Sequence, residues 1–285
     1  MVVKALENIE NLTVKQISII NNKDMSKAIN IDLKTDKDYI PDGVNMINAQ
    51  FMWSKGITGK DVKIAVIDSG CDMTHKDLQT RITGGRNFTI EDNKNIYKYQ
   101  DYNGHGTHVC GTIAASNNNY GVIGVAPDAK LLILKALDKN GSGSMKGIID
   151  AINFAISQRV DIISMSLGMA NDDPKLEKAI KHAINNNILV VCAAGNEGDG
   201  NAEAFEYSYP ASYVDVISVG AVDKKGVPAD FSNSNLVVDL VAPGVDVVST
   251  YPNNQFASLS GTSMAAPHVT GSLALLKNWS REEFQ

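Results

Sequence analysis

Near-continuous apolar runs that alternate with helical patterns constrain the fold of this chain most strongly. Each run is short, rich in Val, Ile and Leu, and too apolar to have one face in water. Strands of this kind, separated by helices, are typical of a parallel sheet covered on both faces. The sequence therefore predicts an α/β fold with a doubly wound, mostly parallel β-sheet and helices on both faces. The predicted strands are 62–67, 130–137, 160–168, 188–194, 214–222 and 236–241, and the predicted helices are 44–53, 146–158 and 174–185.

Composition narrows the class of protein further. The chain has 285 residues, a net charge of -6 and 44% apolar residues, which is a globular profile. Mild acidity argues against nucleic acid as the main partner. No apolar run reaches membrane-spanning length, and the first residues lack a secretory leader pattern. The three cysteines, an odd number, indicate free thiols in a reducing compartment, so we expect a cytoplasmic protein that does not bind membranes.

The chain divides near residue 41. Residues 1–40 are rich in Asn, Lys, Asp and Ile and almost free of Gly, whereas Pro41-Asp42-Gly43 has turn chemistry. We interpret residues 1–40 as an N-terminal extension, and residues 41–285 as the main domain.

Three stretches combine a reactive side chain with small neighbours. Asp68 follows a predicted strand in the sequence D-S-G, His105 lies in G-H-G-T-H, and Ser263 lies in G-T-S-M-A-A-P-H. Nucleophilic acyl transfer needs a hydroxyl, an imidazole that takes its proton, and a carboxylate that orients the imidazole. It also needs a donor for the oxyanion, and Asn196, placed after the strand 188–194, is a candidate.

Two other interpretations compete at these residues. Ser263 also fits a helix N-cap, which is a common structural role. His105 and His108 form an H-x-x-H pair that could bind zinc in a zinc-dependent hydrolase, but no further zinc-ligand motif follows it. A packing role for His108 is therefore favoured.

The order Asp, His, Ser and the three motifs resemble those of subtilisin-like serine proteases, and among these the bacterial intracellular subtilisins in particular. The resemblance runs from about residue 41 to residue 277. It implies a serine endopeptidase of broad specificity that forms an acyl-enzyme, with Ser263 as nucleophile, His105 as general base and then acid, and Asp68 as the orienting carboxylate. It also implies that Asn196 and the backbone N–H of Ser263 form the oxyanion hole. A narrow processing peptidase and a catalytically silent, peptide-binding pseudoprotease remain as alternatives.

The resemblance implies how peptide substrates bind. The substrate would add a strand to the enzyme, so that backbone hydrogen bonds give affinity. One segment would form each wall of the pocket for the residue before the scissile bond. These two segments are Ser166, Leu167 and Gly168, and Ala193, Ala194 and Gly195.

A polar loop at residues 116–122 is a candidate calcium site. It carries an Asn side chain and backbone carbonyls in a Gly-bearing turn, and such oxygen ligands suit Ca²⁺. The loop also resembles the high-affinity calcium loop of subtilisins. That resemblance implies the ligands Asp77, Ser116, Asn118, Tyr120 and Val122, with Asp38 near the position of the family's N-terminal ligand.

Both ends of the chain depart from the family pattern. Intracellular relatives carry a short extension with a Leu-Ile-Pro-Tyr-type motif across the active site, and no such motif precedes Pro41. The extension is a possible short propeptide of a zymogen, and self-inhibition by it is a hypothesis. The chain ends at Gln285, soon after Ser263, so the domain looks short at its C-terminus. A homodimer is implied by the resemblance alone.

Overall fold

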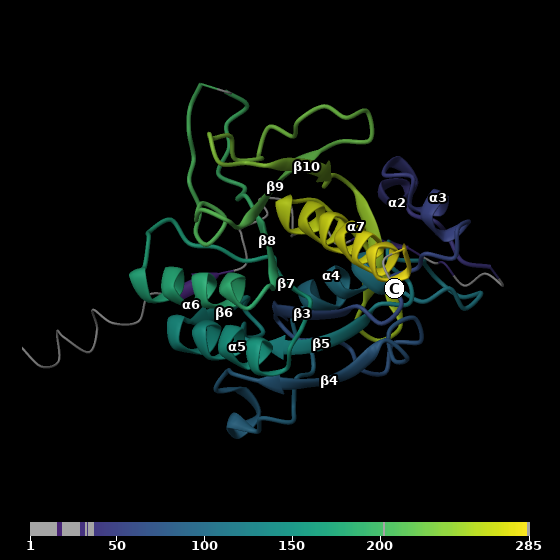
Figure 1. The fold of residues 1–285 in the computed structure, drawn as a ribbon, viewed down its shortest axis with the longest axis horizontal. Helices are drawn as coiled ribbons and strands as arrows, with labels where there is room; N and C mark the ends of the chain where they lie inside the picture. Colours follow the sequence, from purple (N-terminus) through teal and green to yellow (C-terminus); the bar gives the residue numbers. More distant parts are fainter. Residues whose placement is uncertain (1–15, 19–28, 32, 34–36, 202, 284–285) are drawn as a thin grey trace, which may run out of the picture.

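A seven-stranded sheet forms the centre of the computed structural model, which describes residues 16–18, 29–31, 33, 37–201 and 203–283. Its strand order is β10-β9-β8-β7-β3-β5-β4, and every neighbouring pair is parallel. The predicted α/β class and parallel sheet are therefore confirmed (Figure 1). The strands are β3 (Lys63–Asp68), β4 (Ile82–Asn87), β5 (Lys130–Lys135), β7 (Ile162–Met165), β8 (Leu189–Ala193), β9 (Ile217–Val222) and β10 (Leu240–Pro243).

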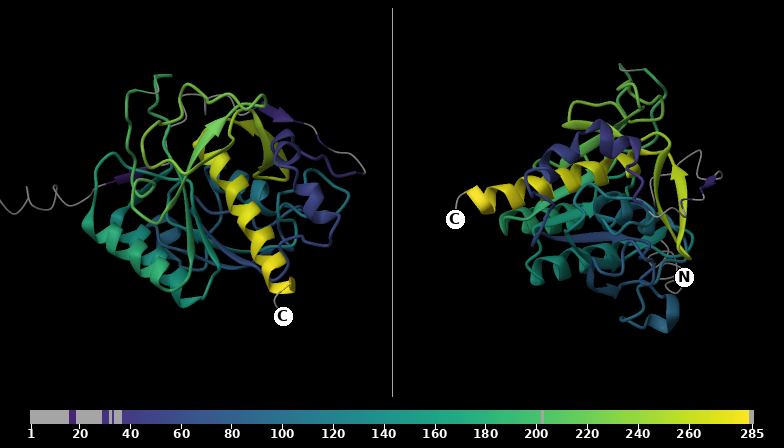
Figure 2. Two further views of the ribbon diagram at one scale, coloured as in Figure 1. Left: turned by 45° about the horizontal axis from the view of Figure 1, so that its top comes forward. Right: turned by 90° about the vertical axis from the view of Figure 1, so that its right-hand side faces the viewer.

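Helices cover both faces of this sheet. Helices α5 (Met145–Ser157) and α6 (Pro174–Asn185) lie on one face, and α4 (His105–Ala114) and α7 (Thr262–Glu283) lie on the other (Figures 1 and 2). The strands face two cores in alternation. In β3, Ile64 and Val66 join the core beneath α4 and α7, whereas Ala65 and Ile67 join the core beneath α5 and α6. Burial on both faces explains why the strand sequences are almost continuously apolar.

Some predicted elements differ from the structure. The predicted helix 44–53 is two short helices, α2 (Asp42–Met46) and α3 (Ala49–Trp53), separated by the left-handed residue Asn48 at φ 56°. The predicted strand 236–241 begins only at Leu240, because the residues before it run along the surface, where Leu236 is 82% exposed.

A second, three-stranded sheet stands beside the main one. Strands β11 (Val247–Tyr251) and β12 (Gln255–Leu259) form a hairpin, and β2 (Ile29–Ile31) adds to β12 in antiparallel orientation. Another part of the N-terminal extension, β1 (Gln16–Ser18), pairs antiparallel with β6 (Ser142–Ser144). Both strands of the extension therefore pair with strands of the main domain.

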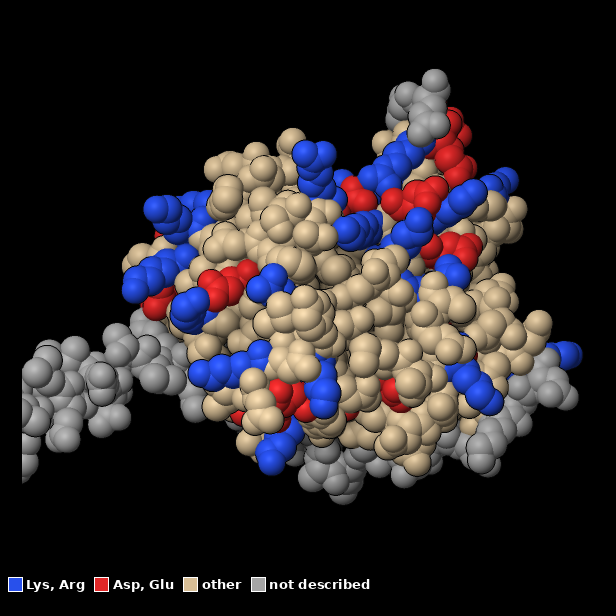
Figure 3. Space-filling model, turned by 90° about the horizontal axis from the view of Figure 1, so that it is seen from below, with Lys and Arg blue, Asp and Glu red and all other residues tan. Residues whose placement is uncertain are grey.

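The C-terminal part of α7 is hydrogen-bonded to the segment that leads into β3. Asn278 Oδ1 accepts the backbone N–H groups of Thr58, Gly59 and Lys60, each at 3.1 Å. No helix in the described part of the chain is long and apolar enough to cross a bilayer. On the face shown in Figure 3, basic and acidic side chains are interspersed.

Candidate active site

The predicted site residues meet at the carboxyl edge of the main sheet. Asp68 ends β3, and Ser166 follows the neighbouring strand β7, in which Met165 pairs with Ile67. Asn196 follows β8, the next strand along. This edge is where open parallel sheets collect their sites. His105 begins α4 and Ser263 is the second residue of α7, so both helices bring a reactive side chain with their first turn.

The carboxylate of Asp68 and the imidazole of His105 form a buried pair. Asp68 Oδ1 lies 2.8 Å from His105 Nδ1 and also accepts the backbone N–H of Ser69 at 2.7 Å. The side chains are 1% and 0% exposed. An acceptor beside Nδ1 places the proton of a neutral imidazole on that atom, which leaves Nε2 as a base. His105 Nε2 is buried and has no hydrogen-bond partner in the part of the chain that the structure describes.

The hydroxyl of Ser263 is held only loosely. Its Oγ donates to the carbonyl oxygen of Ser166 at 3.3 Å, which is long for a bond between oxygens. In return, Ser166 Oγ donates to the carbonyl oxygen of Ser263 at 2.9 Å. The second bond fixes the backbone of Ser263, whereas the first leaves its side chain able to rotate. Catalytic hydrogen bonds are often long in enzymes without substrate and shorten on binding.

Asn196 is fixed against the start of α7. Its Oδ1 accepts both the backbone N–H of Thr262, at 2.9 Å, and the Thr262 hydroxyl, at 2.8 Å. Thr262 Oγ1 accepts the N–H of Gly195 at 3.2 Å. These bonds hold the amide of Asn196 against Thr262, the residue that precedes Ser263.

The two predicted substrate segments lie side by side. Strands β7 and β8 are neighbours, with Met165 opposite Cys192, so the residues that follow each strand leave the sheet together. Leu167, Ala193 and Ala194 are buried. Gly195 has φ +117°, and a Cβ there would lie 2.1 Å from Asn233 Nδ2, so the position requires glycine.

Asp101 is a buried carboxylate at the site that the sequence analysis missed. It connects Ser69, the neighbour of Asp68, to the first turn of α4, and this helps to fix Asp68 relative to His105. The sequence carried one signal, an acidic residue four positions before His105 in a stretch of turn-forming residues. Asp101 accepts bonds from Ser69 Oγ, from the backbone of Asn103, Gly104 and Thr107, and from Thr107 Oγ1, over 2.6–3.0 Å.

His108 has the packing role that the sequence favoured. Its Nε2 lies 2.9 Å from the carbonyl oxygen of Val247 and 3.2 Å from that of Ala257, so it bridges the hairpin β11–β12. Burial, together with the nearby His105, lowers the pKa of His108 to about 3, which keeps the ring neutral. Within the described ranges, no three His, Cys, Asp or Glu side chains converge as a metal site. The zinc alternative therefore gains no ligand set from them.

The residues of the calcium prediction also come together. Asp77 is fully buried, with Oδ1 3.1 Å from Asn118 Nδ2 and Oδ2 accepting the N–H of Val122 at 3.0 Å. Its carbonyl oxygen accepts the N–H of Ser116 at 2.9 Å. The carboxylate of Asp38 accepts N–H groups from residues 118–120 of the same loop. Burial raises the pKa of Asp77 to about 7.

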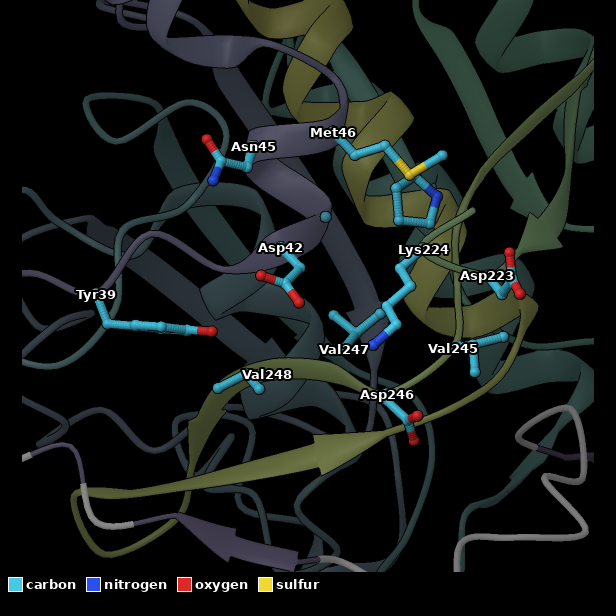
Figure 4. A pocket seen from close by; sticks show the side chains of 12 residues that line it. Tyr39, Asp42, Asn45, Met46, Asp223, Lys224, Val245, Asp246, Val247 and Val248 are labelled. Atoms are coloured by element: carbon cyan, nitrogen blue, oxygen red, sulfur yellow. The ribbon is translucent and has the colours of Figure 1, made fainter. Parts of the chain in front are cut away.

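A separate cavity of about 620 Å³ lies beside α2 and β11 (Figure 4). Its walls carry the carboxylates of Asp42, Asp223 and Asp246 and the ammonium group of Lys224. It includes none of the predicted catalytic or substrate-binding residues.

Comparison with known proteins identifies the family. The model of the subtilase family, Peptidase S8, matches residues 59–285. The major intracellular serine protease of Bacillus subtilis (strain 168) is 54% identical over 251 residues, which is 88% of this chain and 79% of that protein. An intracellular serine protease of Paenibacillus polymyxa is 55% identical over 86% of this chain and 75% of its own length. Subtilisin E of Bacillus subtilis is 45% identical over 83% of this chain and 61% of its own length. With the strand-end site described above, these matches establish that the chain belongs to the subtilase family.

Proposed function

We propose that this chain is a serine endopeptidase that cleaves proteins through an acyl-enzyme on Ser263. The observation that carries the proposal is the buried Asp68–His105 pair. Among the described residues, it leaves an imidazole nitrogen without a partner at the edge of the sheet where α7 begins. The same pair weighs against the silent pseudoprotease, because a peptide-binding module has no need of a buried, oriented base.

The reaction follows from the donors and acceptors at the site. His105 Nε2 takes the proton of Ser263 as Oγ bonds to the substrate carbonyl carbon. The Asn196 amide and the Ser263 backbone N–H stabilise the oxyanion that forms. His105 then gives its proton to the leaving amine as the peptide bond breaks. Water enters, loses a proton to His105 and releases the acyl group, and the proton returns to Ser263. Throughout, Asp68 holds Nδ1 and stabilises the imidazolium.

Substrate is held mainly through its backbone in this proposal. Strand β6 already pairs with an extended segment of the same chain, which supports its use as a peptide-binding strand. Segments Ser166–Gly168 and Ala193–Gly195 would flank the residue before the scissile bond. Recognition through backbone groups favours broad specificity over the narrow processing alternative.

The N-terminal extension is proposed to inhibit the enzyme as a short propeptide. Strand β1 pairs with β6, and β2 pairs with β12. Strand β12 ends at Leu259, four residues before Ser263. Two described pieces of the extension thus pair with strands of the main domain, β6 and β12. Residues 19–28, which join them, lie outside the described part.

Calcium at the loop 116–122 is proposed as a stabilising ligand. Asp77 is a buried carboxylate whose neighbours include a second carboxylate, that of Asp38, and burial disfavours its charge. A divalent cation would compensate both. The amide of Asn118 and the carbonyls of Ser116, Tyr120 and Val122 are further oxygen ligands of the kind that calcium takes.

Location and partners follow from the relatives. The relatives from Bacillus subtilis and Paenibacillus polymyxa that are 54% and 55% identical are both named intracellular serine proteases. We therefore propose that this enzyme works in the cytoplasm and acts on protein substrates. A homodimer belongs to the same proposal.

Labelling with a fluorophosphonate probe tests the nucleophile. The wild-type chain is expected to be labelled and Ser263→Ala to be inert, because only an activated serine reacts at a useful rate. Ser260→Ala, three residues earlier, is the matched control and retains labelling. Equal labelling of wild type and Ser263→Ala would contradict the assignment.

Thermal unfolding with and without calcium tests the loop. Calcium at about a hundredfold above its Kd is expected to add about 2.7 kcal/mol, or roughly 5–10 °C in Tm. Asn118→Ala removes most of this increase, whereas the neighbouring Asn117→Ala keeps it, and magnesium does not replace calcium. An equal calcium response in the two variants would rule out the proposed ligand set.

Removal of residues 1–36 tests self-inhibition and leaves Asp38 in place. The initial rate on a peptide substrate is expected to rise at least about tenfold, since a competing intramolecular strand is lost. Ile17→Pro, which removes one backbone donor from β1, is expected to raise the rate in the same direction. Unchanged rates in both variants would refute the inhibitory role.

A further inference from the structure

A buried ammonium group lies at the end of β5, the strand beside the one that carries Asp68. Lys135 ends β5, pairs in register with Asp68, and is 0% exposed. Its Nζ donates to the carbonyl oxygen of Ser69 at 2.7 Å and to that of Leu137 at 3.1 Å. A lysine is rarely this buried unless its charge is compensated. The Lys135 ammonium group therefore links Ser69, the residue after Asp68, to Leu137 in the segment between β5 and β6.

Glu91 supplies the compensating charge and extends the link. Its Oε2 lies 3.0 Å from Lys135 Nζ, and its Oε1 accepts the backbone N–H of Lys139 at 3.1 Å. Lys139 lies in the turn between β5 and β6. One carboxylate thus joins the buried cation to the turn that leads into β6.

The loop that presents Glu91 has an unusual backbone. Glu91 begins a short 3-10 segment, η2 (Glu91–Lys94), in which Asp92, Asn93 and Lys94 have φ of 52°, 55° and 60°. Non-glycine residues in this region are strained and persist when surrounding contacts hold them. Such a contact is the buried Asn87, whose Nδ2 donates to the carbonyl oxygens of Glu91 and Asn95, each at 3.3 Å.

We propose that Glu91 is a positioning residue that holds the peptide-binding strand β6 in place relative to Asp68, through the buried ammonium group of Lys135. The inference rests on the proposed use of β6 as the substrate edge. Loss of the Glu91 charge leaves Lys135 uncompensated and weakens the hold on the β5–β6 turn. β6 then loosens, and substrates that use several backbone contacts suffer most.

Hydrogen exchange on the full chain tests the hold directly. The measurement uses Ser263→Ala as background, which prevents self-digestion. Adding Glu91→Gln retains an oxygen acceptor for Lys139 but removes the charge, and is expected to speed exchange of amides in residues 138–144 at least about tenfold. Adding Glu177→Gln instead removes an exposed Glu–Lys ion pair from α6, with Lys181, and leaves these amides unchanged. Unchanged exchange at 138–144 in Glu91→Gln, or a rise spread over the whole chain, would overturn the proposal.

Steady-state kinetics tests whether Glu91 positions β6 or only stabilises the fold. Two substrates are compared in the Ser263 enzyme carrying Ile17→Pro, in which β1 no longer competes for β6: a peptide anilide with four residues before the scissile bond and a single-residue ester. The ratio of kcat/KM for the peptide to that for the ester is expected to fall about tenfold in Glu91→Gln, mainly through KM, and to stay constant in Glu177→Gln. An equal fall for both substrates would overturn the positioning role. Absence of ester cleavage in every variant would instead contradict the proposed endopeptidase.

Discussion

Burial of the Asp68 carboxylate is the constraint on which the rest of this site depends. A carboxylate removed from water is stable only when its oxygens are hydrogen-bonded or paired. Asp68 Oδ1 meets this need through Ser69 N–H and His105 Nδ1, whereas the buried Oδ2 has no hydrogen-bond partner among the described residues. The bond to Nδ1 also orients the imidazole of His105. The arrangement that stabilises the Asp68 charge therefore also leaves His105 Nε2 available as a base.

The parallel sheet and its glycines make that arrangement possible. Neighbouring strand ends bring Asp68, Ser166 and Asn196 to one edge, and α4 and α7 begin at the site. A Cβ on Gly106 would lie 2.2 Å from the carbonyl oxygen of Gly70. Glycine in the sequence G-H-G-T-H is therefore what lets the first turn of α4 approach the end of β3.

Sequence reasoning reached the parts of this structure that local patterns encode. The parallel sheet followed from its continuous apolar strands, and the candidate site residues at its carboxyl edge, Asp68, Ser166 and Asn196 among them, were named in advance. β4 and β6 carried no such signal, because Gly and Ser dominate β6 and Gly interrupts β4. Asp101, Glu91 and Lys135 were missed for a different reason. Each also has a partner that is distant in the sequence, as with Lys135 and Ser69, 66 positions apart, and no local pattern records such contacts.

The kinetic effect of Asp68→Asn tests the catalytic role of the buried pair most directly. The substitution keeps the size of the side chain and removes its charge, so the fold is retained while Nδ1 loses its anionic acceptor. If Asp68 fixes the tautomer of His105, kcat for a single-residue ester at neutral pH falls by about 10⁴-fold. A loss of less than about tenfold, with the unfolding temperature unchanged, would show that the Asp68–His105 pair does not drive catalysis in this enzyme.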